Sequence, residues 1–204
     1  MSPAPKTLTA DECHLLLEAL HSRDGTPKQQ RRGIRNNTIA LCMLDAGLRV
    51  GEVVRLYVCD LWFNKVPVKA IDLGADVGEK GCCRLVPLTQ RLSEAVELMS
   101  INYWTDLVNP GTCRAFYTSN PNKSLTTRQI ERTIGSAAIK SLGRSINPHV
   151  LRHTFATRLM RKTNARVVQQ LLGHKRLSST QIYMHPDQQD LASAIDTLNE
   201  PDTQ

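Results

Sequence analysis

Residues 148–157 read PHVLRHTFAT, and the interpretation of the whole chain begins with them. Pro148 predicts the start of a helix, because the backbone N–H that proline lacks would have no intrahelical acceptor in the first turn. Within that helix, the i, i+3 spacing puts His149 and Arg152 on one face, where both side chains can reach a single phosphate. A solvated basic helix face is the alternative interpretation. The stretch therefore predicts a helix and leaves its function open.

Helical patterns also dominate the chain on both sides of this stretch. Thr9 and Glu12 have the capping-box spacing of a helix start, and apolar residues follow at helical intervals to about Ser22. A second helix is expected from Ile34 to a glycine cap at Gly47. Similar apolar spacing predicts further helices over residues 89–107, 125–142, 164–172, 178–184 and 186–198. The chain is therefore predicted to be mainly α-helical.

Residues 66–88 have a different pattern. Two β-favouring runs, 66–73 and 82–88, are separated by glycines that permit turns. They predict a small antiparallel β-sheet. The expected fold class is therefore mainly α with a small antiparallel β-sheet, an α+β fold.

The composition suits a folded protein that binds a polyanion. A chain of 204 residues with 41% hydrophobic residues can build one domain with a substantial core. Lys and Arg outnumber Asp and Glu by 26 to 19, and the positive field attracts polyanions, with nucleic acid first and an anionic membrane surface second. No repeat or linker divides the chain. It is interpreted as a single domain over 1–204, with a core over about 8–185, a C-terminal helix over 186–198 and a tail over 199–204.

Targeting signals and cysteine spacing indicate the setting. No run approaches the roughly 20 apolar residues that cross a bilayer, and residues 1–9 lack the apolar centre of a signal peptide. A cytoplasmic protein with no membrane partner is expected. The six cysteines form no CxxC pair, and several lie in apolar helical patterns, so they are interpreted as reduced structural thiols rather than metal ligands or disulfides.

Three further side chains suit the cleavage of a phosphodiester without a metal. That chemistry needs a nucleophile, cations around the developing negative charge and an acid for the leaving oxygen. Tyr183 lies nine residues after His174, which follows the glycine end of a short helix, and Arg49 follows the second helix. Each has a plain alternative: Tyr183 as a packing residue, His174 as a surface or core residue, and Arg49 as a helix-end cation. Taken singly, none of them decides the function.

The joint arrangement of these residues resembles the tyrosine recombinase family, also called the phage integrase family, which includes the bacterial Xer recombinases. Residues 46–56 (AGLRVGEVVRL) resemble the family's first arginine box, and residues 148–157 resemble its HxxR box. Residues 171–185 (LLGHKRLSSTQIYMH) resemble the box that joins the second active-site histidine to the nucleophilic tyrosine. The resemblance extends from about Leu8 to Leu198 and implies the catalytic-domain fold of that family.

The resemblance implies a site-specific DNA recombinase that works through Tyr183. This tyrosine would attack the scissile phosphate, form a 3′-phosphotyrosyl link and release a 5′-hydroxyl, and a second 5′-hydroxyl would then restore the backbone. Arg49 and Arg152 would hold the non-bridging oxygens, a task that suits planar, permanently charged guanidiniums. No metal ion and no cofactor enter this scheme. The outcome would be DNA integration, excision, inversion or resolution.

The other implied catalytic residues are Lys80, His149 and His174. Lys80, the expected general acid, is the only lysine near the turn before residues 84–88, and a solvated turn lysine is the alternative. His149 would assist proton transfer at the tyrosine, and His174 would hydrogen-bond the phosphate. Glu52, three residues after the first arginine, is expected to pair with a neighbouring arginine and hold it in place, or else to be an exposed glutamate.

Double-stranded DNA is the implied partner. Members of the family clamp DNA between an N-terminal core-binding domain and the catalytic domain, and this chain is expected to lack the former, either as a trimmed catalytic part or as a naturally short member. Basic side chains, with one glutamine, would then contact the DNA. The candidates are Arg31, Arg32, Arg128, Gln129, Arg132, Lys175 and Arg176. On the predicted helix over 125–142 such side chains could read guanine and adenine edges, or could form a solvated basic face.

Protein partners and rival functions follow from the same resemblance. Protomers of the same protein would form a synaptic tetramer on DNA, with accessory DNA-bending proteins as further partners, in the cytoplasm at the nucleoid. The helix over 186–198 would pack into a neighbouring protomer or against its own domain. A type IB topoisomerase and a DNA-binding accessory protein without activity are the alternatives.

Overall fold

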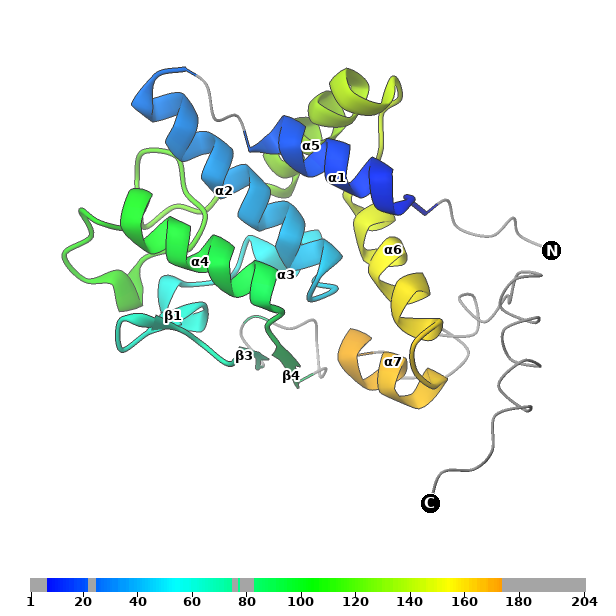
Figure 1. Ribbon diagram of the computed structural model, residues 1–204. Coiled ribbons are helices and arrows are strands. Elements are labelled where there is room, and N and C mark those ends of the chain that lie inside the picture. Colours follow the sequence, from blue (N-terminus) through cyan, green and yellow to red (C-terminus); the bar gives the residue numbers. More distant parts are fainter. Residues whose placement is uncertain (1–6, 22–24, 75–76, 78–82, 174–204) are drawn as a thin grey trace, which may run out of the picture.

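The computed structural model describes residues 7–21, 25–74, 77 and 83–173, which form a helical body with two small sheets at one side (Figure 1). Its helices are α1 (Ala10–Leu20), α2 (Pro27–Leu44), α3 (Val50–Val53), α4 (Gln90–Asn102), α5 (Thr127–Leu142), α6 (Pro148–Met160) and α7 (Ala165–Leu172), with 3-10 turns η1 (Val58–Asp60) and η2 (Pro110–Thr112). Its strands are β1 (Trp62–Phe63), β2 (Val66–Pro67), β3 (Ala70–Leu73) and β4 (Arg84–Pro87). The predicted fold class is confirmed, and the helices predicted over 178–184 and 186–198 lie outside the described residues.

Capping residues determine where the first two helices begin. Thr9 and Glu12 form the predicted capping box: the Glu12 N–H donates to Thr9 Oγ1 at 3.2 Å, and the Thr9 N–H donates to Glu12 Oε2 at 3.0 Å. α2 begins at Pro27, earlier than its apolar pattern predicts, because Thr26 and Gln29 form a second capping box around the first-turn proline. The basic residues between Pro27 and Ile34 therefore lie on this helix.

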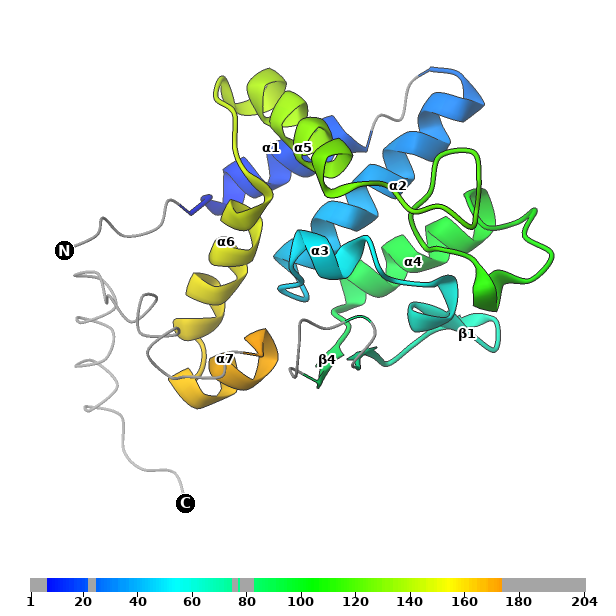
Figure 2. The ribbon, with the colours of Figure 1, turned by 180° about the vertical axis from the view of Figure 1, so that it is seen from behind.

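α2 is the centre of the molecule, and α1, α4, α5 and α6 pack around it (Figures 1 and 2). Every residue from 38 to 44 is buried, so this half of α2 is surrounded by other elements. Burial raises the pKa of the Cys42 thiol to about 12, which suits a structural role. No described helix, α2 included, is both long enough and apolar enough to cross a membrane. A smaller apolar cluster of Ala156, Val168 and Leu172 joins α6 to α7.

α4 ends at Asn102, five residues before the predicted end near Leu107. The apolar pattern continues, but Trp104 turns into the core, where it is 5% exposed. Its Nε1–H donates to the backbone carbonyl of Ala115 at 3.0 Å. A buried indole N–H needs such an acceptor, so this contact with a distant segment ends the helix.

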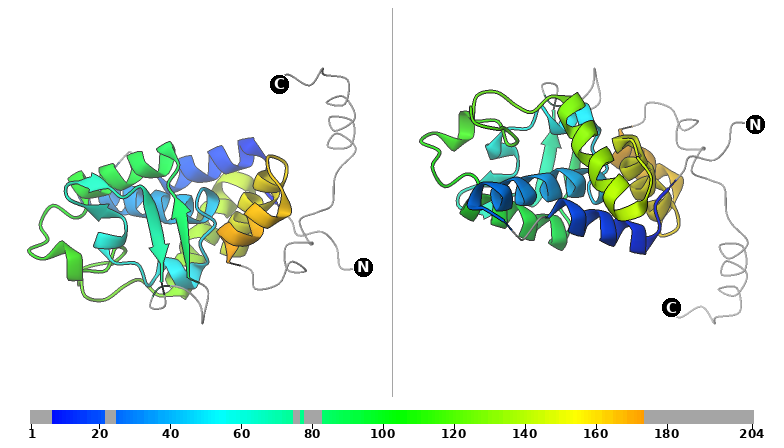
Figure 3. Two further views of the ribbon diagram at one scale, coloured as in Figure 1. Left: turned by 90° about the horizontal axis from the view of Figure 1, so that it is seen from below. Right: turned by 90° about the horizontal axis from the view of Figure 1, so that it is seen from above.

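The predicted β-region forms two separate two-stranded antiparallel sheets, and the run over 66–73 is divided between them. β1 pairs with β2 across a turn in which Asn64 and Lys65 have φ values of 50° and 63°. β3 and β4 lie side by side as antiparallel strands (Figure 3). Their register sets Leu73 opposite Arg84. Alternation along β4 puts Arg84 and Val86 on the buried face. A charged side chain therefore enters the interior from this sheet.

Contacts from two sides hold α6 in place. Gly47 follows α2 with a φ of 62°, and a Cβ there would lie 2.4 Å from Phe155 Cδ1 on α6, so this close approach requires glycine. On the other side, the Leu8 N–H donates to Thr154 Oγ1 on α6 at 2.9 Å. The helix that contains His149 and Arg152 is thus fixed against both α2 and the segment before α1.

Candidate active site

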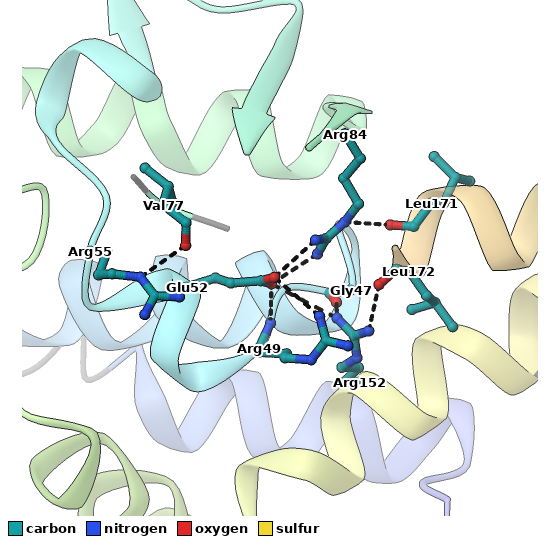
Figure 4. Close-up of polar contacts among 9 residues, drawn as sticks. All are labelled: Gly47, Arg49, Glu52, Arg55, Val77, Arg84, Arg152, Leu171 and Leu172. Carbon is teal, nitrogen blue, oxygen red and sulfur yellow. Dashed lines mark hydrogen bonds and ion pairs between the residues drawn. The ribbon is translucent and has the colours of Figure 1, made fainter. Parts of the chain in front are cut away.

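A single carboxylate, that of Glu52, lies at the centre of the candidate site (Figure 4). Its side chain is fully buried on α3, so the alternative of an exposed glutamate does not apply. Glu52 Oε2 accepts the backbone N–H of Arg49 at 2.7 Å, and Oε1 accepts Arg49 Nη1 at 3.2 Å. The first contact caps the short helix α3, and the second holds the Arg49 side chain beside it.

Arg84 reaches the same carboxylate from β4. Its Nη1 donates to Glu52 Oε1 and its Nη2 donates to Glu52 Oε2, each at 2.8 Å. This is the bidentate geometry in which a guanidinium and a carboxylate bind most strongly. Its Nε donates to the carbonyl oxygen of Leu171, near the end of α7, at 2.8 Å. All three guanidinium nitrogens of Arg84 are therefore used inside the protein.

Arg152 completes the cluster from α6. Its Nη1 lies 3.8 Å from Glu52 Oε2 and donates to the carbonyl oxygen of Gly47. Its Nη2 donates to the carbonyl oxygen of Leu172 at 2.7 Å. Arg152, which extends from α6, thus connects the turn after α2 with the end of α7.

The charges of this cluster do not cancel. Burial alone would raise the pKa of Glu52, but the hydrogen bond and charge of Arg84, with the Arg49 N–H and the charge of Arg152, outweigh burial and hold this pKa below its usual range. One carboxylate therefore faces three guanidiniums, which leaves a formal excess of two positive charges. Arg49 is the outermost, with 22% of its side chain exposed, against 6% for Arg152 and 3% for Arg84. Such a preorganised positive site can stabilise a phosphate and the negative charge of its transition state.

Two histidines flank the cluster on α6. His149 lies in the first turn, is exposed, and donates its backbone N–H to Asn147 Oδ1, which caps the helix, at 2.9 Å. His153 is half-buried, and burial, followed by the charges of His149 and Arg152, lowers its pKa. Burial therefore favours the neutral imidazole of His153, whereas His149 is exposed to solvent. Among the described residues, no His, Cys, Asp and Glu side chains gather in a group that could hold a metal ion.

The structure places three of the six predicted catalytic residues. Arg49 and Arg152 meet at Glu52, and His149 lies one turn before Arg152 on α6. The other predicted residues lie outside the described part of the chain: Lys80, His174 and Tyr183, together with Lys175 and Arg176 of the predicted DNA-binding set.

Sequence reasoning missed Arg84, which makes the shortest ion pair of the cluster with Glu52. It also missed Arg55, whose Nε donates to the carbonyl oxygen of Val77 at 2.9 Å. A signal for Arg84 is present in the sequence, because it alternates with two apolar strand residues, Val86 and Leu88, and therefore shares their face. A charge on the apolar face of a strand indicates a buried partner.

The basic residues of α2 and α5 gather at a second place. Arg31 and Arg32 on α2, and Gln129 and Arg132 on α5, line one cavity of about 990 Å³. Arg128 is exposed on the first turn of α5. The side-chain oxygen of Gln129 accepts the Thr126 N–H at 2.8 Å and so caps α5. The cavity brings together four of the seven residues predicted to contact DNA.

Comparisons with known proteins agree with this geometry. The model of the phage integrase family matches residues 6–190. Tyrosine recombinase XerC of Proteus mirabilis is 32% identical over 200 residues, which cover 96% of this chain and 59% of that protein. The chain thus spans less than two thirds of the length of this curated relative.

Solved structures share the fold. The crystal structure of XerA recombinase superposes with a TM-score of 0.74 at 26% identity, and the match covers 98% of this chain and 67% of that one. The XerH site-specific recombinase, bound to a palindromic difH substrate in a post-cleavage complex, superposes with a TM-score of 0.71 at 24% identity. That match covers 97% of this chain and 54% of XerH.

Proposed function

Because the chain belongs to the phage integrase family, we propose that it is the catalytic domain of a tyrosine site-specific recombinase. The proposal rests on one observation: Arg49 and Arg152, from two boxes far apart in the sequence, converge on the buried carboxylate of Glu52. Phosphoryl transfer needs cations fixed where negative charge develops, and this pair provides them. The relatives described as tyrosine recombinase XerC support the same activity, and neither a topoisomerase nor an inactive accessory protein is favoured.

The proposed reaction exchanges one phosphodiester for another. The Tyr183 oxygen attacks the phosphorus and displaces the 5′-oxygen, which takes a proton from Lys80 and leaves as a hydroxyl. Arg49 and Arg152 hold the non-bridging oxygens, with His149 assisting proton transfer and His174 hydrogen-bonding the phosphate. A second 5′-hydroxyl reverses the attack and frees Tyr183. The proposal gives no step to a metal ion or a cofactor.

The cavity between α2 and α5 is the proposed place of DNA contact outside the active site. Arg31, Arg32 and Arg132 can neutralise phosphates there, and Arg128 and Gln129 lie at the start of α5, where a base edge can be reached. XerH, which shares the fold, is described as bound to its difH substrate, and this supports DNA as the kind of partner. Lys175 and Arg176 belong to the same proposal.

The whole recombinase is proposed to act as a tetramer of identical protomers on paired DNA sites, with accessory DNA-bending proteins at the nucleoid. Residues 1–204 form a single catalytic domain in this proposal. The chain spans 59% of the XerC relative, so the activity of a whole recombinase is itself part of the proposal. Integration, excision, inversion and resolution use the same chemistry and differ in how the sites are arranged.

Covalent trapping tests the proposal directly. The protein is incubated in EDTA with nicked duplexes from a randomised pool, and adducts that survive denaturant are counted. Tyr183→Phe removes the nucleophilic oxygen and should abolish the adduct. Tyr57→Phe is the matched control, because it removes a hydroxyl from a ring that packs 4.1 Å from the Arg114 guanidinium, and it should leave the adduct unchanged.

Two results would overturn the proposal. One is an adduct that persists in Tyr183→Phe, and the other is DNA that binds the parent protein without any adduct. Relaxation of plasmid DNA without exchange of flanking sequence would instead indicate a topoisomerase.

A further inference from the structure

Arg84 joins three elements that are distant in the sequence. It extends from β4, binds both carboxylate oxygens of Glu52 on α3, and donates to the carbonyl oxygen of Leu171 on α7. Its side chain is 3% exposed. All three of its guanidinium nitrogens donate to groups of the protein, so any effect of Arg84 on a reaction passes through the groups that it holds.

The end of α7 depends on two of the arginines. The last carbonyls of a helix have no intrahelical donors, and their partial negative charge favours a cation. Arg84 Nε donates to the carbonyl oxygen of Leu171, and Arg152 Nη2 donates to that of Leu172. The last two carbonyls of α7 are therefore each capped by a guanidinium that also faces Glu52. The end of α7 is thereby tied to the carboxylate that orients Arg49.

Gly173 makes this approach possible. It follows α7 with a φ of 65°, and a Cβ at this position would lie 3.0 Å from Arg84 Nη1. Glycine therefore permits both the left-handed turn and the close passage of the arginine. The next residue in the sequence is His174, so the place where α7 ends determines where the chain continues toward His174 and Tyr183.

We propose that Arg84 is a positioning residue for strand cleavage, which locks the end of α7 to Glu52 and so fixes the point from which the segment with the nucleophile begins. This inference rests on the proposed function. Stability alone explains the arrangement poorly, because a buried ion pair often contributes no more to stability than apolar residues of the same volume. The contacts of Arg84 instead fix the positions of α3, β4 and α7 relative to one another.

Two substitutions separate geometry from charge. Arg84→Lys keeps a positive charge beside Glu52, but a single ammonium cannot bind both carboxylate oxygens and the Leu171 carbonyl in the same geometry. Arg84→Met removes the charge and keeps most of the volume. Arg91→Met is the matched control, because Arg91 makes an equally bidentate contact with a different carboxylate, that of Asp45, and 47% of its side chain is exposed.

Each variant is measured in three ways. The rate of adduct formation is followed in a single turnover on the nicked duplexes that the parent protein selects, and the Kd for the same duplexes is measured by anisotropy. Hydrogen–deuterium exchange is compared between the amides of α7 and those of α1. We expect Arg84→Lys and Arg84→Met to slow adduct formation by roughly 10- to 100-fold, the loss that follows a misplacement of about 1 Å. Kd should change less than about twofold, because the Arg84 side chain is buried and offers little surface to a bound duplex.

Hydrogen–deuterium exchange of the α7 amides shows whether Arg84 acts through α7. Amides of α7 should exchange faster in both variants while those of α1 keep the parent rate, and Arg91→Met should change neither exchange in α7 nor the cleavage rate. If Arg84→Met does not fold, Arg84→Lys alone decides. Parent-like cleavage by Arg84→Lys would overturn the inference, because charge without the fork geometry would then suffice.

The two proposals can fail separately. Unchanged exchange in α7 of both Arg84 variants overturns the positioning role even if cleavage slows. A parent protein that binds DNA and forms no adduct overturns the proposed function, and the exchange data still decide whether Arg84 holds α7.

Discussion

Glu52→Gln should be among the most damaging single substitutions in the molecule. The amide keeps the size of the side chain and removes the charge, which leaves Arg84 and Arg152 buried at 3% and 6% exposure without a counter-charge. One of the two oxygens also becomes an NH₂ group that faces guanidinium donors. Removing one partner of a buried ion pair costs about 3–5 kcal/mol. At roughly 2–4 °C per kcal/mol for a domain of this size, Tm should fall by roughly 6–20 °C.

Urea and thermal unfolding measure this loss, with Glu97→Gln on the exposed face of α4 as the control.

The stability that the Glu52 carboxylate provides depends on pH in a defined direction. Because the folded pKa of Glu52 lies below its usual range, its stabilisation is complete above the unfolded pKa of about 4.3 and is lost as pH falls through the folded pKa. The stability difference between the parent and Glu52→Gln should therefore be constant from about pH 5 to 7 and shrink in more acid solution. A loss below about 1 kcal/mol at pH 7, the scale of a surface pair, would refute this account of the site.

Two further substitutions test the fold and the DNA surface. Gly47→Ala should lower the free energy of unfolding in urea by about 2–5 kcal/mol, because alanine there has a left-handed φ and its Cβ clashes with Phe155. Gly143→Ala has a similar φ of 68° but open space around it, so it should lower the same free energy by only about 1 kcal/mol. Equal losses in the two variants would exclude the clash. Arg132→Ala should reduce the slope of log Kd against log salt by about 1 in DNA titrations, whereas Arg91→Ala should leave the slope unchanged. An unaltered slope in Arg132→Ala would remove that arginine from the proposed DNA surface.

Features that depend on neighbouring residues were predictable from the sequence. The start of α1 follows from Thr9 and Glu12, and the start of α6 follows from its first-turn proline, because both depend on contacts within one helical turn. The start of α2 was placed too late, since the apolar pattern begins at Ile34 while the capping box at Thr26 and Gln29 sets the boundary. Capping chemistry was the better guide there.

Features that depend on distant contacts were not predictable. The β1–β2 turn uses Asn64 and Lys65 at positive φ, and this pair lacks the glycine that usually marks such a turn. The strand pattern signals that Arg84 has a buried partner, but it does not identify Glu52, which lies 32 residues away. The resemblance to a known family identified Arg49 and Arg152, but it did not reveal the third guanidinium that binds the same carboxylate.

The contacts of Glu52 also determine at which stage of folding the cluster is complete. Arg49 precedes α3, Arg84 lies on β4 and Arg152 lies on α6, and the contact between Arg152 and Gly47 closes a loop of 105 residues. A growing or partly unfolded chain can form the Arg49 contact, which is local, and can add the Arg84 contact once β4 is present, but it lacks the Arg152 contact until α6 docks. Under the proposed function, cleavage competence should therefore emerge only after α6 has docked.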